Sequence, residues 1–537
     1  MKKIKLKKSD PIETVEKGEA TQEMEAIMDA ASGDTTEIDL LLDIHAPKEE
    51  LPTDTDTNDG IDDIPDAFDA PAENPEQTVN PPVSEADSSD VPSDSEETED
   101  DTEDELQPTE PAPDEELPAD SEQTPVSSEQ GDDASEDYKK LGLYLHIPFC
   151  KSKCAYCDFY SSDKIVCRGR KTPEEMKLYC TALKNNMRII SERTTQYNVD
   201  TVFIGGGTPT ALPEKLLLDI VKEVERDFYL DEECEFTVEM NPATADAHLL
   251  KKLRKAGVNR LSIGLQSAHN HELAALSRIH TAGDFTECFQ MAREAGFDNI
   301  NIDVMYGIPE QTKSSFMETL EFVTAMKPEH ISMYNLRIED GTPFGEKKHM
   351  LPLPDEDTEC EMYFDGIAFL ASRGYHQYEI SNFARDGYEC RHNLRYWLGE
   401  EYIGCGPAAH SYFGGRRFSL RRSFAQYCKL LETKGTSIPS SLLDESYVID
   451  RREEVAEYLM LRLRLAKGIS AEDFKARFGA DFDEIFGKKL AIYIKNGLMT
   501  HENGHYAFTP QGMFVSNEIL SRIIPFETKY EKGGKNS

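Results

Sequence analysis

The stretch LHIPFCKSKCAYCDFYS, residues 145–161, decides the fold, because it places three cysteines within eight residues, directly after an apolar run. Cys150, Cys154 and Cys157 form a CxxxCxxC loop. Thiolates are the usual ligands of iron–sulfur clusters, and such a loop can present three of them to three corners of a cube, which leaves one iron open. Zinc usually takes four protein ligands, and the loop contains no fourth cysteine or histidine. We therefore favour a cluster over zinc.

The charge of the chain is concentrated in its first quarter. The 537 residues include 102 acidic and 58 basic side chains, a net charge of −44, and residues 1–137 alone hold 45 acidic and 7 basic ones. Residues 51–138 contain no Lys or Arg and are rich in Asp, Glu, Pro, Ser and Thr. Self-repulsion and a lack of apolar side chains favour disorder in such a segment. We predict that residues 1–137 form a disordered acidic tail.

The sequence also predicts where the protein resides. The basic start, MKKIKLKKSD, is not followed by the apolar segment of a secretory signal. No stretch approaches the roughly 18 apolar residues of a spanning helix. The odd total of 11 cysteines has no paired spacing outside the loop, which fits a reducing compartment better than a disulfide framework. We expect a soluble, cytoplasmic protein without a transmembrane segment.

Beyond the tail, apolar strand-like runs alternate with longer segments of helical periodicity. The expected strands span residues 141–147, 201–206, 235–240, 260–267, 299–307 and 330–336. Thr172 and Glu175 resemble a capping box, with Pro173 at the first helical position. This βα repeat predicts an α/β fold with a parallel sheet, and the spacing alone fits a partial barrel or an open sheet equally well.

Polar residues stand where these strands end. Gly205, Gly206 and Gly207 precede Thr208 in the sequence GGGTP, where missing side chains would let a ligand approach the backbone and its amide groups. Buried polar groups need partners, which for any one of these residues can be a local loop or helix end. In parallel α/β folds, however, sites lie at the carboxyl ends of strands. The candidates at the later strand ends are Glu239, Gln266, Arg278 and Asp303.

Together, YLHIPFC (144–150), GGGTP (205–209) and NIDVMYGIPEQT (301–312) resemble the coproporphyrinogen-oxidase-like branch of the radical S-adenosylmethionine (SAM) superfamily. The resemblance extends from Leu141 to the C-terminus and implies a partial (βα)6 barrel. It implies a 4Fe-4S cluster on the three cysteines, whose open iron binds SAM and whose reduced form cleaves it. It also assigns SAM contacts: Tyr144 and Tyr156 flank the cluster and SAM, Gly206, Gly207 and Thr208 hold the methionine end, and Glu239, Gln266, Arg278 and Asp303 contact the remainder.

Within this branch, three features favour a heme chaperone group over the oxygen-independent coproporphyrinogen III dehydrogenases. Phe159 stands where the dehydrogenases have a further cysteine, and an acidic segment replaces their arginine-bearing N-terminal region. HNLRYW (392–397) matches the HNxxYW motif that the chaperone group uses for heme. His392 is therefore our candidate heme ligand, because neutral imidazole ligates heme iron well. The structural alternative is a packed, hydrogen-bonded histidine.

We therefore expect a protein that binds a 4Fe-4S cluster, SAM and heme and delivers the heme to heme-accepting membrane or respiratory proteins. The alternative is a dehydrogenase that oxidatively decarboxylates two propionates of coproporphyrinogen III. The sequence identifies no catalytic residue.

The C-terminal half contains two further features. YIGCGPAAHSYFGG (402–415) is a glycine-rich loop with His410, and Arg416, Arg417, Arg421 and Arg422 follow it as a basic cluster. Residues from about 445 to 525 have the pattern of a winged helix, with a hairpin at Asn503–Gly504. No basic stripe accompanies it, so we expect no nucleic acid partner. The predicted domains are the tail (1–137), the barrel (138–375), a heme-side extension (376–440) and the winged-helix-like domain (441–537).

Overall fold

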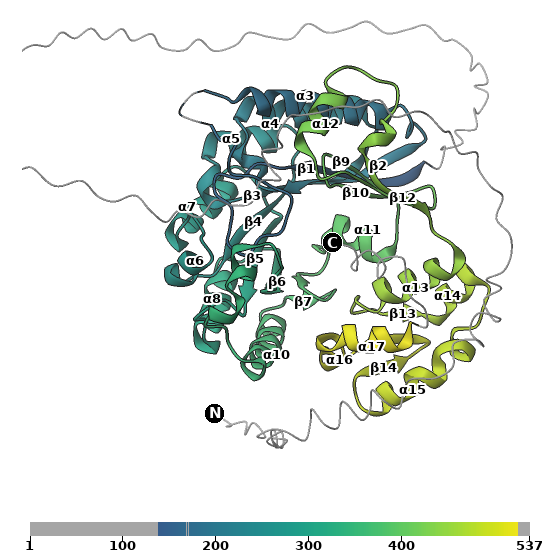
Figure 1. Ribbon diagram of the computed structural model, residues 1–537. Coiled ribbons are helices and arrows are strands. Elements are labelled where there is room, and N and C mark those ends of the chain that lie inside the picture. The colour runs from purple at the N-terminus through teal and green to yellow at the C-terminus, as the bar shows by residue number, and fades with distance from the viewer. Residues whose placement is uncertain (1–137, 168, 170, 525–537) are drawn as a thin grey trace, which may run out of the picture. The chain divides into compact units, whose positions relative to one another are not determined.

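The computed structural model describes residues 138–167, 169 and 171–524 (Figure 1). The predicted acidic tail, residues 1–137, lies outside the described residues. From residue 139 onward, strands and helices alternate as the sequence predicts. The units are β1 (Lys139–Ile147), α3 (Glu174–Ser191), β2 (Tyr197–Gly206), α4 (Glu214–Asp227), β3 (Leu230–Met240), α5 (Ala247–Lys255), β4 (Arg260–Gln266), α6 (Asn270–Ala275), α7 (Ala282–Glu294), β5 (Ile300–Tyr306), α8 (Lys313–Ala325) and β6 (His330–Asn335).

Strands β1 to β6 are parallel, and each pairs with the next in sequence, for example Leu145 with Ile204. All six predicted strands are confirmed. The described sheet continues past both ends of this set, in the order β12-β11-β10-β9-β1-β2-β3-β4-β5-β6-β8-β7. The added strands are β7 (His376–Gln377), β8 (Asn382–Ala384), β9 (Tyr402–Cys405), β10 (His410–Phe413), β11 (Arg416–Leu420) and β12 (Leu443–Val448).

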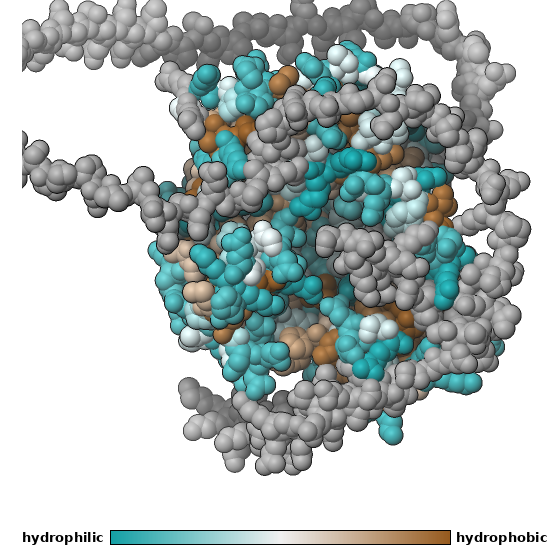
Figure 2. Space-filling view, in the orientation of Figure 1, coloured by the Kyte–Doolittle hydropathy of each residue, from teal (hydrophilic) through white to brown (hydrophobic). Residues whose placement is uncertain are grey.

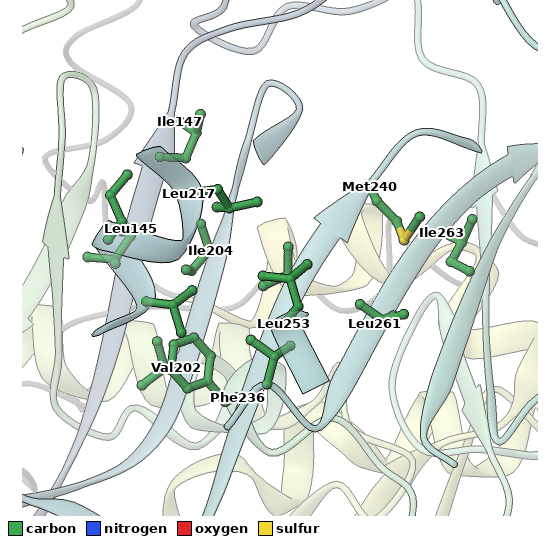
Figure 3. Close-up of a cluster of buried hydrophobic side chains, with 14 of the residues drawn as sticks. Leu145, Ile147, Val202, Ile204, Leu217, Phe236, Met240, Leu253, Leu261 and Ile263 are labelled. Atoms are coloured by element: carbon green, nitrogen blue, oxygen red, sulfur yellow. The ribbon is translucent and has the colours of Figure 1, made fainter. Parts of the chain in front are cut away.

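Apolar side chains on one face of the sheet pack against helices. Figure 3 shows Leu145, Val202 and Ile204 from the strands beside Leu217 of α4 and Leu253 of α5, and all five side chains are buried. In Figure 1 the helices α3, α4, α5, α7, α8 and α10 (Glu356–Ser372) lie along this outer face. Polar residues such as Tyr144, Glu239 and Asp303 occupy the opposite face of the same strands, where they line a cavity. A sheet covered by helices on one face thus leaves its other face free to form a site.

The predicted capping box at the start of α3 is wrong. The residue that precedes the helix is Pro173, and no side chain caps the helix. A proline side chain carries no oxygen that could accept a hydrogen bond from the first turn, so Thr172 and Glu175 do not form the reciprocal pair. The helix begins at Glu174 without that interaction.

The C-terminal region has its own sheet and its own core. Its helices are α13 (Arg451–Arg462), α14 (Ala471–Phe478) and α15 (Lys488–Lys495), and its described sheet has the order β13 (Ile469–Ser470), β15 (His505–Phe508), β14 (Met499–Glu502). The predicted hairpin is confirmed, with Asn503 at φ 53° and Gly504 at φ 76°, as a two-residue turn requires. Phe474, Phe482 and Tyr506 are among its buried core residues. The winged-helix classification stays a prediction.

On the face drawn in Figure 2, hydrophilic residues predominate and hydrophobic residues form smaller patches between them. Within the part of the chain that the structure describes, no helix is both long and apolar enough to span a bilayer.

A buried carboxyl group lies beside the contact with the C-terminal region, where the amide of Ala466 donates to the carbonyl of Tyr378. Glu379 is 1% exposed, its Oε1 has no hydrogen-bond partner, and burial raises its pKa to about 7. The folded state therefore binds more protons than the unfolded state between about pH 4.5 and 7. Stability from this group is present below that window and is lost as the pH rises through it.

Glu379→Gln is accordingly expected to stabilise the protein at pH 8 by about 3 kcal/mol, since glutamine removes the buried charge that forms above pH 7. At pH 4.5 the substitution is expected to be nearly neutral. Thermal unfolding midpoints at the two pH values measure the difference, with the exposed Glu346→Gln as control. An equal shift at both pH values would contradict the assignment.

Candidate functional site

The cysteine loop leaves β1 at Ile147 and is fastened at its base by backbone hydrogen bonds. The amide of Cys150 donates to Ser162 O at 3.0 Å, and the amide of Ser162 donates to Pro148 O at 2.9 Å. Cys150 is buried, whereas Cys154 and Cys157 are partly exposed. Burial, together with the nearby sulfurs of Cys154 and Cys150, raises the pKa of the Cys157 thiol to about 11. The loop therefore gathers all three sulfurs.

Hydrogen-bond donors lie beside these sulfurs, among them Arg278 and Thr208. Arg278 Nη1 lies 3.5 Å from Cys154 Sγ, and Thr208 Oγ1 lies 3.7 Å from Cys150 Sγ. A guanidinium beside a thiolate stabilises its charge. Among the described residues, no group of three or more His, Cys, Asp or Glu side chains is arranged to hold a single metal ion. The donor set of three gathered thiols and adjacent hydrogen-bond donors fits an iron–sulfur cube.

The expectation that the GGGTP amides are offered to a ligand is wrong. The amide of Gly206 donates to Glu239 Oε2 at 3.1 Å, that of Gly207 to Ile147 O at 2.8 Å, and that of Thr208 to Phe149 O at 2.7 Å. A Cβ at Gly207 would come within 2.8 Å of two carbonyl oxygens and 3.1 Å of Cys150 Sγ. The glycines therefore let the second strand end pack tightly on the cysteine loop.

The polar strand ends surround a cavity of about 500 Å³, here called the barrel cavity, which lies in the usual size range of small-molecule sites. Six sequence-predicted site residues and one cluster cysteine line it: Tyr144, Tyr156, Glu239, Gln266, Asp303, His392 and Cys157. The remaining candidates do not line it: Cys150, Cys154, Gly206, Gly207, Thr208 and Arg278. Most of the candidates that do not line the cavity are packed at the base of the cysteine loop.

Two carboxyl groups that line the barrel cavity, those of Glu239 and Asp303, have raised pKa values. Burial, followed by the neighbouring Asp303, raises the pKa of Glu239 to about 7. Burial also raises the pKa of Asp303, although Asn301 Nδ2 donates to its Oδ1 at 2.7 Å. A cationic group in the cavity would lower both pKa values, so these carboxyl groups favour a ligand with positive charge and hydroxyl donors.

Helix α11 (Arg391–Leu398) carries the HNLRYW motif and closes one side of the barrel cavity. The carboxylate of Glu235 on β3 accepts hydrogen bonds from the amides of Arg391 and His392, at 3.0 and 3.1 Å. Arg395, which is buried, pairs with Asp200 of β2. Two strands thus fix the helix at its first turn and its middle.

His392 is 1% exposed, and both ring nitrogens are engaged. Nδ1 lies 2.9 Å from Thr201 Oγ1, and Nε2 lies 2.8 Å from the hydroxyl of Tyr396. The ring stacks on Phe203, with centroids 5.3 Å apart. Burial, followed by Arg395 and Arg260, lowers its pKa to about 3, so the imidazole is neutral at physiological pH. In this conformation Nε2 is occupied by Tyr396.

Several residues that line the barrel cavity were not predicted from the sequence, and Phe203 and Arg260 are two of them. Phe203 stacks on the His392 ring, and Arg260, which is 1% exposed, lines the barrel cavity. Among the described residues, Arg260 Nε has no hydrogen-bond partner. An ionisable residue at the start of the strand-like run RLSIGLQ was the signal that could have identified Arg260.

Family comparisons agree with this architecture. The radical SAM superfamily model matches residues 144–323, and the HemN C-terminal domain model matches residues 449–515. The solved structure of coproporphyrinogen III oxidase (HemN) from Escherichia coli aligns with a TM-score of 0.62 at 24% identity, covering 72% of this chain and 90% of that one. Fold and site together define a radical SAM protein.

Curated relatives narrow this class. Heme chaperone HemW of Bacillus subtilis (strain 168) is 36% identical over 386 residues, which cover 71% of this chain and 98% of the relative. Heme chaperone HemW of Escherichia coli (strain K12) is 32% identical over 389 residues, covering 72% and 98%. The chain belongs to the HemW family.

Proposed function

We propose that this protein is a heme chaperone that holds a 4Fe-4S cluster and SAM, binds heme beside them, and delivers it in the cytoplasm to heme-accepting membrane or respiratory proteins. The relatives' name, heme chaperone, supports the cargo. The observation that carries the proposal is the position of α11, which sets His392 and Tyr396 of the HNLRYW motif in the wall of the barrel cavity.

The cluster and SAM are assigned to one end of this cavity. Cys150, Cys154 and Cys157 would hold the cluster, and the cluster supplies an open iron and one electron when it is bound and reduced. Tyr144 and Tyr156 would flank SAM, and Glu239 would accept from ribose hydroxyls. Gly206, Gly207 and Thr208 would border the methionine end through groups other than their occupied amides. Gln266, Arg278 and Asp303 complete the assigned contacts.

We assign His392 as the heme ligand, on the condition that its Nε2 is first released from Tyr396. Because Tyr396 occupies Nε2, the Tyr396 hydroxyl has to leave before Nε2 can bind iron. The neutral imidazole needs no proton loss at physiological pH. The cost of ligation therefore includes one hydrogen bond, which is worth about 0.5–1.5 kcal/mol net.

Tyr396→Phe is expected to tighten heme binding roughly three- to tenfold, since it removes the bond that competes with iron for Nε2. Equilibrium titration of the purified protein with ferric heme measures the change. Tyr375→Phe is the matched control, because Tyr375 is also buried and its hydroxyl donates to Pro328 O at 2.7 Å, but it does not line the barrel cavity. If Tyr396→Phe binds heme with unchanged or weaker affinity, His392 Nε2 is not the ligand of the iron.

The proposed function itself is tested by anaerobic titration of the cluster-reconstituted full-length chain with heme, followed by absorbance in the Soret region. We expect saturation at one heme per chain and an imidazole-ligated spectrum. Only weak, unsaturable heme binding would defeat the proposal.

A further inference from the structure

A second cavity of about 420 Å³ adjoins the barrel cavity. We call it the β9–β10 cavity, because Tyr402, Ala408 and His410 from that part of the chain form its far wall. The two cavities share five lining residues: Tyr144, Asp158, Phe159, Glu239 and Tyr396. The side chain of Tyr396 therefore stands between the two spaces, and it is the same side chain that occupies His392 Nε2.

His410 differs from the other histidine of this cavity in what its ring nitrogens contact. Both nitrogens of His146 are engaged, Nδ1 at 3.0 Å from the Tyr144 hydroxyl and Nε2 at 2.7 Å from Tyr160 O. His410 is exposed, and within the described residues its ring forms no hydrogen bond or ion pair. Burial of part of the ring lowers its pKa, which favours the neutral imidazole that iron requires.

The backbone of His410 is fixed by strand pairing, although its side chain is exposed. It is the first residue of β10 and pairs with Ser419 of β11. The amide of Leu420 donates to Ala409 O at 2.9 Å, directly beside it. A ligand on a paired strand keeps its position, which is the arrangement that a binding site needs.

Asp158 and Glu239 also line this cavity, but the part of its wall around Phe159, Tyr160 and Arg422 suits a flat molecule with carboxylates. Phe159 is 64% exposed, an unusual position for a phenylalanine, and it lines the cavity beside Tyr160. Arg422 lies over the Tyr160 ring at 5.6 Å, and its Nη2 donates to Asp158 O at 3.1 Å. An aromatic face and a fixed guanidinium match a macrocycle and its propionates.

We infer that the β9–β10 cavity is a heme-capture site in which His410 is the first ligand to the iron. The inference rests on the proposed function and extends it. His410 Nε2 or Nδ1 donates its lone pair to the iron without any rearrangement. Transfer inward breaks this bond, Tyr396 swings from His392, and His392 Nε2 forms the new bond to the same iron. This exchange of one neutral imidazole for another changes neither the oxidation state of the iron nor the protonation of either histidine.

The test is stopped-flow mixing of ferric heme with the full-length, cluster-reconstituted chain and with His410→Ala, His392→Gln and the double variant. We expect His410→Ala to slow heme association at least fivefold. We expect His392→Gln to retain an imidazole-ligated spectrum that disappears in the double variant. His349→Ala is the control, because His349 is exposed and lines neither cavity.

Association by His410→Ala at the wild-type rate, or loss of all imidazole ligation in His392→Gln alone, would overturn the capture site while leaving the heme chaperone proposal intact. A wild-type chain that binds no heme would instead defeat the proposed function.

Discussion

Cys154→Ser is expected to abolish the iron–sulfur cluster, so that reconstituted protein retains close to none of the roughly four irons expected per chain. Cys154 is the middle cysteine of the loop, and its sulfur receives the Arg278 guanidinium at 3.5 Å. A serine hydroxyl is a far poorer ligand than a thiolate, and two remaining thiolates hold a cube weakly. Iron and sulfide analysis after anaerobic reconstitution, with absorbance spectra, measures the loss.

The matched control is Cys167→Ser, because Cys167 is exposed and lies outside the loop. The C-terminal region should stay folded in both variants, since its buried core around Phe474 contains no residue of the loop. Circular dichroism and limited proteolysis report this. Intact 4Fe-4S spectra in Cys154→Ser would refute the ligand set.

His392→Gln is expected to weaken heme binding about a hundredfold, close to 2.7 kcal/mol. The glutamine side chain can still form hydrogen bonds with the hydroxyls of Thr201 and Tyr396, which would otherwise lose their partner. Glutamine is, however, a poor axial ligand of heme iron. The heme dissociation rate should rise correspondingly, and the residual complex should be the one held by His410. Competition with a tight heme-binding acceptor measures the rate.

The thermal unfolding midpoint separates loss of ligand from loss of fold in this variant. It should fall by only a few degrees, because the hydrogen bonds and much of the packing on Phe203 are retained. His280→Gln is a second control, since His280 is also buried and bonded to a carbonyl, Leu265 O, but lines neither cavity. Wild-type heme affinity in His392→Gln would exclude His392 as a ligand.

Much of the fold could be predicted from the sequence because the deciding signals are local. The six parallel strands are short apolar runs bounded by helical periodicity, and three cysteines on one loop identify their own chemistry. Asn503 and Gly504 predicted their hairpin because only a few residue types tolerate positive φ at both positions. Each of these signals lies within one segment.

The rest depends on contacts between distant segments. Nothing in the GGGTP motif indicates that its amides bond to the cysteine loop and to Glu239. The parallel pairing of β9 with β1, which brings His410 beside the cysteine loop, joins residues more than 250 positions apart. The engagement of His392 by Tyr396 and the burial of Arg260 are likewise properties of the folded chain.

The most direct measurement is product analysis of the reconstituted full-length protein, incubated anaerobically with SAM and reductant, with heme in one vessel and coproporphyrinogen III in another. As a carrier, the protein should release heme chemically unchanged and leave coproporphyrinogen III unconverted. Turnover of coproporphyrinogen III to protoporphyrinogen IX would make the protein a dehydrogenase and contradict the account.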